Sequence, residues 1–163
     1  GSAGTQLLPQ AQLDRFMIRI SMGYPDRESE IAMLKQERVN VAIDSLEEII
    51  KITDLVLMKQ QAERVYVHED LYRYIVDIVC ATRNHPDLSM GISPRGTISL
   101  LQMAKANAYL DERDYMVPGD VKDVFYATSA HRVVKSKEAR IKRKTVRDIL
   151  ESIAEGIPVP ESR

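Results

Sequence analysis

Residues 93–111 read SPRGTISLLQMAKANAYLD, and this stretch decides the class of fold. Ser93 can accept hydrogen bonds from the free amides of a first helical turn, and Pro94 is tolerated only in that turn. Apolar residues then recur at helical spacing: Ile98, Leu101, Ala104 and Ala108. The pattern predicts a helix from Pro94 to about Asp111.

Segments on both sides of this helix carry similar signals. Residues 69–83 place one apolar stripe at helical spacing: Leu71, Ile75, Ile78, Val79 and Thr82. Pro118 opens another helix, with Val121, Val124, Phe125 and Thr128 on one face. Thr145 is a candidate N-cap for a last helix that runs to Glu155. These segments predict a bundle rather than a sheet.

The N-terminal third is less regular. Asp26 can cap a helix to about Gln36 with Ile31 and Leu34 on its buried face, and Thr53 can cap a helix to about Arg64. We interpret Val39 to Ile52 as a connector with one helical turn. In Phe16–Met22 apolar residues alternate as in a strand. A single strand has no ladder partner, so we expect it to be left over from a larger sheet. The predicted fold is mainly α, with five or six helices and one strand.

Composition excludes several classes of protein. The chain has 163 residues, of which 44% are hydrophobic and 29% charged, with a net charge of −1. These values are typical of a globular domain. The single cysteine, Cys80, excludes a disulfide within the chain, and the three histidines are too far apart for an HExxH metal motif. No apolar run approaches 18 residues, so we expect no membrane partner and a cytoplasmic location.

The seven glycines never fall into GxxxxGK or GxGxxG, which excludes a glycine-backbone phosphate cradle in this chain. Basic residues cluster over residues 132–147, a run that contains eight of them and only one acid, Glu138. A helical nucleic-acid module would use such a run. It contains no aromatic side chain to stack bases, which favours a solvated linker and helix start, with His131 and Arg132 suited to a helix C-terminus.

Two arginines raise a question about function. Arg95 stands in the first turn of a helix, where the helix dipole disfavours a cation by about 0.3–1 kcal/mol. A bound anion would offset this cost, because free amides and a guanidinium can hold one phosphate together. A side chain in solvent explains the position equally well. Arg15 follows Asp14, and the two could form an ordinary surface pair.

The sequence also resembles a known family. Residues 8–16, LPQAQLDRF, followed by Gly23-Tyr24-Pro25, resemble the segment after sensor 1 in MoxR-type AAA+ ATPases. Further motifs match the helical lid of that family in order and spacing: Tyr66-Val67, Asp70-Leu71, Tyr74-Ile75-Val76, Ala81-Thr82-Arg83, His85-Pro86-Asp87, Gly91-Ile92-Ser93-Pro94-Arg95, Asp114-Tyr115, Pro118, Asp120-Val121-Lys122 and Ala130-His131-Arg132. The resemblance covers about residues 4–160.

The resemblance implies roles that spacing alone does not. Arg15 of LDRF corresponds to the arginine finger, which reaches the γ-phosphate of ATP on the neighbouring subunit. Arg95 corresponds to the sensor 2 residue, which contacts ATP of its own subunit, with Ser93 and Pro94 beside it. The parent protein would bind ATP and Mg²⁺ and hydrolyse ATP in a ring, as a hexamer. It would act as a chaperone-like remodeller of a protein client, alongside a protein with a von Willebrand factor A domain.

The resemblance also divides the chain. Residues 1–3 resemble a cloning scar, residues 4–24 would be the end of the nucleotide-binding core, and residues 25–163 the lid. Walker A, Walker B and sensor 1 have no counterpart in this sequence, so we expect this part alone neither to hydrolyse ATP nor to bind it tightly. A magnesium-chelatase-type AAA+ subunit is the neighbouring alternative, because LDRF alone does not separate the two.

Three positions depart from the family pattern. Gly96 stands where alanine is usual, and a glycine in a helix costs up to about 1 kcal/mol. Val117 and His68 stand where a hydroxyl N-cap is common, which would weaken each helix by about 1 kcal/mol. None of the three departures removes Arg15 or Arg95.

Overall fold

The computed structural model describes residues 8–35 and 47–160. They fall into two compact units. The first contains the described residues up to Arg19 and those from Lys59 onward, and the second is Ile20–Met58. Within the described residues, six helices have eight or more residues and two are shorter, so the predicted mainly α class and helix number are confirmed.

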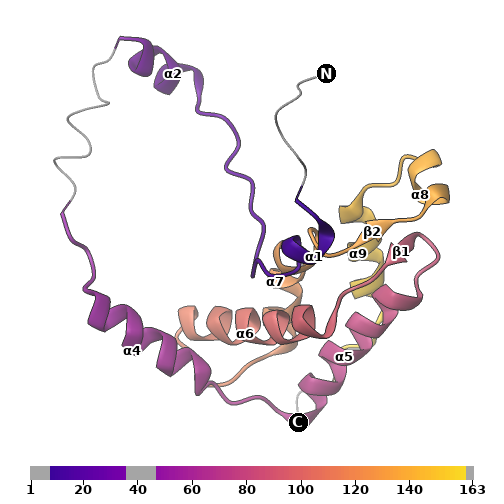
Figure 1. The fold of residues 1–163 in the computed structure, drawn as a ribbon. Helices are drawn as coiled ribbons and strands as arrows, with labels where there is room; N and C mark the ends of the chain where they lie inside the picture. Colours follow the sequence, from indigo (N-terminus) through magenta and orange to yellow (C-terminus); the bar gives the residue numbers. More distant parts are fainter. Residues whose placement is uncertain (1–7, 36–46, 161–163) are drawn as a thin grey trace. The chain divides into compact units, whose positions relative to one another are not determined.

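The first unit is built on four packed helices: α5 (Glu69–Asn84), α6 (Pro94–Leu110), α7 (Pro118–Ser129) and α9 (Val146–Gly156). Their most extensive contact is between α6 and α7. Two short helices, α1 (Gln10–Leu13) and α8 (Lys137–Ile141), complete this unit, and the last residues of α4 (Ile52–Glu63) also belong to it. Figure 1 shows the order of these elements along the chain.

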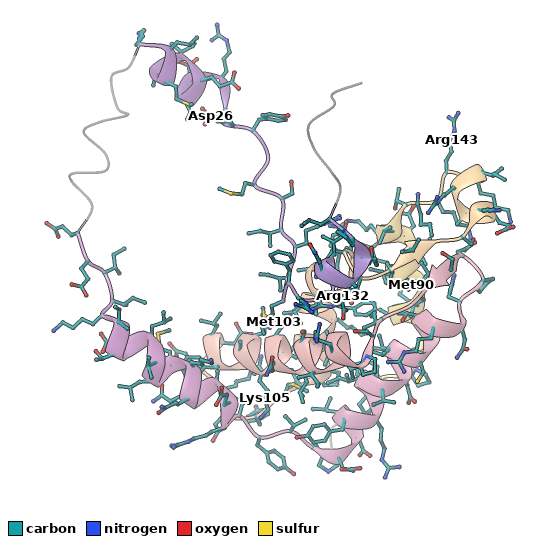
Figure 2. The ribbon with its side chains drawn as sticks, viewed as in Figure 1. Asp26, Met90, Met103, Lys105, Arg132 and Arg143 are labelled. Atoms are coloured by element: carbon teal, nitrogen blue, oxygen red, sulfur yellow. The ribbon has the colours of Figure 1, made fainter. Side chains whose placement is uncertain are left out.

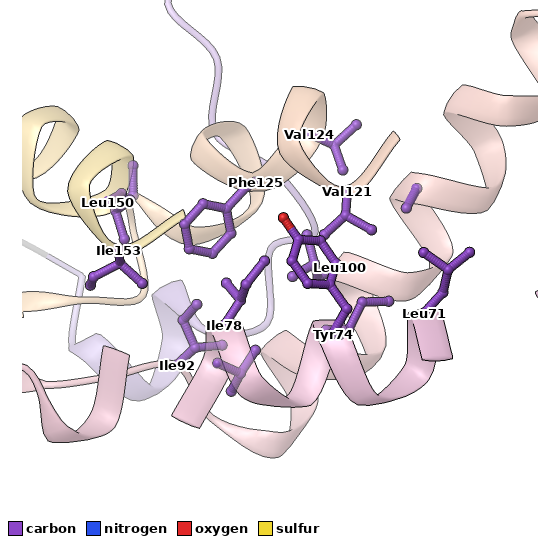
Figure 3. Close-up of a cluster of buried hydrophobic side chains, with 14 of the residues drawn as sticks. Leu71, Tyr74, Ile78, Ile92, Leu100, Val121, Val124, Phe125, Leu150 and Ile153 are labelled. Carbon is purple, nitrogen blue, oxygen red and sulfur yellow. The ribbon is translucent and has the colours of Figure 1, made fainter. Parts of the chain in front are cut away.

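The core lies where α5, α6, α7 and α9 meet. The α5 stripe predicted from the sequence is buried in full, and Tyr74 joins it. Figure 3 shows Ile78 of α5 between Ile92, which precedes α6, and Phe125 of α7, with Leu150 and Ile153 of α9 beside them. Burial of a large aliphatic side chain stabilises a fold by about 1.5–3 kcal/mol, so these contacts hold the bundle together.

Helix caps account for several boundaries. Ser93 Oγ accepts the Gly96 N–H at 3.1 Å, and Thr145 Oγ1 accepts the Asp148 N–H at 3.1 Å. Asp26 caps α2 (Arg27–Leu34) as predicted, through a 2.7 Å bond from the Ser29 N–H. The two N-cap positions without a hydroxyl, His68 and Val117, are capped by other hydrogen bonds. His68 Nδ1 accepts the Asp70 N–H at 3.3 Å, and at the start of α7 the Val117 N–H donates to Asp120 Oδ2 at 2.7 Å.

Other predictions are corrected. The strand over residues 16–22 is not formed, because the described residues offer it no ladder partner. Its one backbone-to-backbone hydrogen bond to a distant element runs from the Arg19 N–H to Ala127 O at 2.8 Å. The structure also contains two strands that the sequence does not predict, β1 (Leu88–Met90) and β2 (Val134–Lys135), which pair antiparallel. These strands are too short for an alternation pattern to reveal them.

Three further details differ in the N-terminal third. Leu34 is 84% exposed rather than buried, and α2 has no buried residue. Helix α4 begins at Ile52, one residue before the predicted cap, and Asp54 Oδ2 accepts the Lys51 N–H at 3.2 Å there. Most of the predicted connector 39–52 lies outside the described residues. Within residues 8–35 and 47–160 we find no helix long and apolar enough to cross a membrane.

An ion pair between the partly exposed Arg113 and the buried Asp120 fastens the turn between α6 and α7. Helix α6 ends in a left-handed turn at Glu112, and the Arg113 N–H bonds to Ala108 O at 2.9 Å. This turn aims Arg113 at Asp120, whose two carboxylate oxygens it reaches at 2.6 and 2.8 Å. Asn107 Nδ2 adds a third bond at 3.0 Å. Burial alone would raise the pKa of Asp120, but these hydrogen bonds lower it.

Asp120→Asn should therefore destabilise the chain by about 3 kcal/mol, because it leaves Arg113 and the Val117 N–H facing an amide. Urea unfolding at pH 7 measures this loss. Since the pKa of Asp120 is lowered in the folded state, the difference from the wild type should shrink below about pH 4 as the carboxyl protonates.

Asp111→Asn is the matched control, because Asp111 binds the same guanidinium at 3.0 Å but its side chain is 61% exposed. It should cost less than about 1 kcal/mol. Equal losses in the two variants would contradict the assignment of this pair.

Candidate functional site

The start of α6 is joined to the N-terminal segment by one carboxylate. Besides capping α6, Ser93 Oγ donates to Asp14, with Oδ1 at 2.8 Å and Oδ2 at 2.9 Å. Asp14 Oδ2 lies 4.0 Å from the Arg95 guanidinium, and Asp14 Oδ1 lies 3.3 Å from Arg132 Nε. The LDRF and SPR motifs, 79 residues apart at Asp14 and Ser93, therefore meet at Asp14.

Asp14 is the anion that lies beside Arg95 in the first turn of α6. A nearby anion offsets the cost of a cation in the first turn of a helix, and the structure supplies a protein carboxylate at the limit of ion-pair distance. The Arg95 side chain nevertheless stays 57% exposed. It can therefore still reach a second anion from solvent.

Arg132 is the residue that the sequence did not single out as a site. We expected it to be a solvated cation at a helix end, but it is only 2% exposed. Its guanidinium donates to three backbone carbonyls of the N-terminal segment: Phe16 O at 2.7 Å, Met17 O at 3.0 Å and Asp14 O at 3.3 Å. It also donates to Ser99 Oγ of α6 at 3.1 Å and to Thr128 O of α7.

The burial of Arg132 has a clear electrostatic consequence. Desolvation lowers its pKa, and the nearby Asp14 carboxylate acts in the opposite direction. Even a lowered arginine pKa leaves the group charged at neutral pH. A buried charge is tolerated only when it is paired and hydrogen-bonded, and here most of its partners belong to residues 14–17. Figure 2 shows Arg132 beneath α1, whereas Arg143 projects away from the first unit.

Gly96 makes room for this guanidinium. A Cβ atom at position 96 would lie 2.5 Å from Ile92 Cγ2 and 2.8 Å from Arg132 Cδ. Both distances are shorter than side-chain packing allows. The glycine that appeared to be a defect in the first turn of α6 is therefore a packing requirement of Arg132.

His131 holds the same segment. Its Nε2 lies 2.9 Å from Phe16 O, so Nε2 carries the proton and donates it, because a carbonyl can only accept. Nδ1 is buried and has no partner among the described residues. Burial lowers the pKa of His131 and keeps the ring neutral. The His131 carbonyl in turn accepts from Gln10 Nε2 of α1 at 2.8 Å.

Arg15 follows directly after Asp14, and its side chain is exposed. Within residues 8–35 and 47–160 its guanidinium has no hydrogen-bond or ion-pair partner, whereas its backbone N–H bonds to Gln12 O at 3.1 Å. The structure thus brings Asp14, Ser93, Arg95 and Arg132 into one cluster, which we call the Asp14 cluster. Arg15 extends from its edge.

The basic run 132–147 is not a continuous positive surface. Arg132 is buried, Lys144 Nζ is paired with Asp87, and Arg147 stacks 4.0 Å above the Tyr126 ring. The hydrogen bond from Lys144 lowers the pKa of Asp87. Among the described residues, no group of three or more His, Cys, Asp or Glu side chains could hold a metal ion.

Comparison with known proteins identifies the fold. Residues 80–153 match the family model described as an AAA lid domain. The chain superposes on the crystal structure of a candidate ATPase from Cytophaga hutchinsonii with a TM-score of 0.86 and 32% identity, covering 99% of this chain and 52% of that one. The helical bundle is thus that of an AAA lid domain.

Curated relatives narrow this class. The chain is 36% identical over 160 residues to the uncharacterized protein YeaC of Bacillus subtilis, covering 98% of this chain and 50% of that protein. It is 29% identical over 167 residues to the chaperone MoxR1 of Mycobacterium tuberculosis, covering 97% of this chain and 44% of that protein. Together, the lid-domain match and these relatives support a lid of the MoxR-type AAA+ ATPases. It spans about half the length of these curated relatives.

Gly96→Ala tests the packing around Arg132. Helix propensity alone predicts a gain of up to about 1 kcal/mol, whereas the close approach to Ile92 and Arg132 predicts a loss of about 1–3 kcal/mol from overpacking. We expect the loss, measured as a lower urea midpoint at pH 7.

The control is Gly119→Ala in α7, where a Cβ would meet only Val117 Cγ2 at 3.8 Å. It should be neutral or stabilising by up to about 1 kcal/mol. A stabilising Gly96→Ala would show that Arg132 does not need the space.

The neutral His131 ring predicts a pH dependence. Because its pKa is lowered in the folded state, the unfolded chain binds the proton first, and stability should fall as the pH drops from about 7 to 5. His131→Gln retains an N–H donor and cannot titrate, so its thermal midpoint should change less over this range. Parallel curves for the two proteins would contradict the buried neutral ring.

Proposed function

We propose that this lid belongs to an ATP-hydrolysing ring in which Arg95 acts on ATP of its own subunit and Arg15 on ATP of the neighbour. The Asp14 cluster carries the proposal, because it joins the segment before Arg15 to the helix start at Arg95 while both guanidinium groups stay exposed. Residues 4–24 would form the end of the nucleotide-binding core and residues 25–163 the lid.

The chemistry of the two arginines fits phosphoryl transfer. Charge builds up on the phosphate oxygens during this reaction, and a guanidinium can bind two of these oxygens at once. Arg95 stands at a capped helix N-terminus, with Ser93 and Pro94 fixing the first turn. Arginine fingers in other phosphoryl-transfer enzymes increase the rate by about 10³–10⁵. ATP and Mg²⁺ would be held by the core, outside these residues.

The cellular role follows the named relatives. One of them is called a chaperone, and we propose a chaperone-like remodelling role for the complete protein. Its partners would be identical subunits, arranged as a hexamer, a protein client and a protein with a von Willebrand factor A domain, in the cytoplasm. Arg132, Lys144 and Arg147 of the basic run are engaged within the fold, so nucleic acid is not favoured as a partner.

The two arginine roles can be tested by complementation in the full-length protein. Arg15→Ala and Arg95→Ala should each lower ATP turnover by at least tenfold in pure rings. In an equal mixture, a subunit with intact Arg95 can receive Arg15 from its neighbour, so about one site in four should recover by random assortment around the ring. Phosphate release measures this recovery.

Arg143→Ala is the control, since Arg143 is exposed on the surface away from the cluster. It should keep full turnover alone and in mixtures. If mixtures of the two inactive variants recover no activity although mixed rings form, the assignment of one arginine in cis and one in trans is wrong.

A further inference from the structure

We propose that Arg132 is the positioning residue of Arg15, and that it acts by clamping the backbone on both sides of Arg15. The proposal rests on the function proposed above for Arg15, because a finger must be held in place to act on a neighbouring subunit. Arg132 makes no hydrogen bond to the side chain of Arg15 or of Arg95.

The guanidinium of Arg132 donates mainly to the backbone around Arg15. Three of its hydrogen bonds go to carbonyls of Asp14, Phe16 and Met17. Its Nε makes no hydrogen bond within the described part of the chain but lies at ion-pair distance from the Asp14 carboxylate, 3.3 Å away. Residue 15 lies between these anchored groups. The clamp therefore fixes the backbone immediately before and after Arg15 and leaves the Arg15 side chain free in solvent.

Burying the Arg132 guanidinium costs free energy. A guanidinium whose side chain is only 1% exposed loses its hydration, and replacing such a group by packed apolar residues is often neutral or stabilising. Stability alone therefore does not account for an arginine at position 132. The three carbonyl contacts do, because a planar group with five N–H donors can hold several acceptors in fixed directions.

Two neighbours support the clamp. Gly96 supplies the space for Arg132 Cδ, and His131 Nε2–H adds a second donor to Phe16 O at 2.9 Å. Arg132 also bonds to Ser99 Oγ at 3.1 Å and to Thr128 O, so the clamp is itself anchored to α6 and α7. The backbone at Arg15 is therefore held against α6 and α7, and Arg95 lies in the first turn of α6.

The first experiment measures placement in this chain without using ATP. Nitroxide labels go on Arg15→Cys and Leu110→Cys, with Cys80→Ala as background. Leu110 is 69% exposed at the far end of α6, about 24 Å along the axis from its start. Pulsed electron paramagnetic resonance gives the distance distribution between the labels. Arg132→Lys keeps the charge but loses the planar fork, and should at least double the width of the distribution.

Arg143→Lys should leave the width unchanged. Asp14→Asn is the second variant in case Arg132→Lys does not fold, because it removes the ion pair but keeps an acceptor for Ser93, and it should also broaden the distribution. An unchanged width in a folded Arg132→Lys or Asp14→Asn variant would overturn the clamp.

The second experiment asks which arginine Arg132 serves, in the full-length ring. If it positions Arg15, Arg132→Lys should lower kcat at least tenfold with the KM for ATP within about twofold. It should recover activity when mixed with Arg95→Ala but not with Arg15→Ala. Adding Arg132→Lys to Arg15→Ala should cause no further loss.

The other outcomes are distinct. Recovery with Arg15→Ala instead would mean that Arg132 acts through Arg95, and recovery with neither would mean a general structural role; both overturn the proposal. If Arg15→Ala itself keeps full turnover, the proposed function fails, while the label distances still decide whether Arg132 fixes the segment.

Discussion

The buried guanidinium of Arg132 constrains the rest of the first unit. A charge with 2% exposure is stable only if its donors meet acceptors, and these come from three places in the chain: residues 14–17, Ser99 of α6 and Thr128 of α7. This requirement brings the N-terminal segment against the start of α6. Arg132 Cδ also adds to the close contact with Ile92 Cγ2 that leaves room only for glycine at position 96.

A second ion pair, between the partly exposed Arg113 and the buried Asp120, lies at the opposite end of α6 and α7. Each pair fixes one end of the two helices, and apolar contacts such as Leu100 and Val121, both fully buried, fill the space between them. Apolar packing has no fixed direction, whereas hydrogen bonds from a guanidinium are directional. The Arg113–Asp120 pair, and the bonds from Arg132 to Ser99 of α6 and Thr128 of α7, therefore fix α6 and α7 against each other at their two ends.

Local signals explain what the sequence could predict. The starts of α6, α7 and α9, the buried stripe of α5 and the Asp26 cap all depend on residues within a few positions of each other, and the structure contains each of them. The misses depend on distant contacts. The strand over 16–22 needs a neighbouring strand, β1 is defined only by β2 across the fold, and Leu34 has a helical position but no neighbour to cover it. The burial of Arg132 gives no sequence signal, because its acceptors are mainly backbone carbonyls. The resemblance to a family pointed to Arg15 and Arg95, but not to the Asp14 carboxylate that connects them.

The contact between Arg95 and Asp14 leaves Arg95 able to exchange partners. An ion pair at 4.0 Å with the arginine 57% exposed contributes only about 0–1 kcal/mol, so it orients the guanidinium without holding it firmly. A phosphate carries more charge than a carboxylate and offers more acceptor oxygens, and would therefore compete well for Arg95. Asp14 would not be left unpaired by that exchange, because Ser93 Oγ and Arg132 Nε remain beside it. The carboxylate can thus release Arg95 while the segment that carries Arg15 stays clamped.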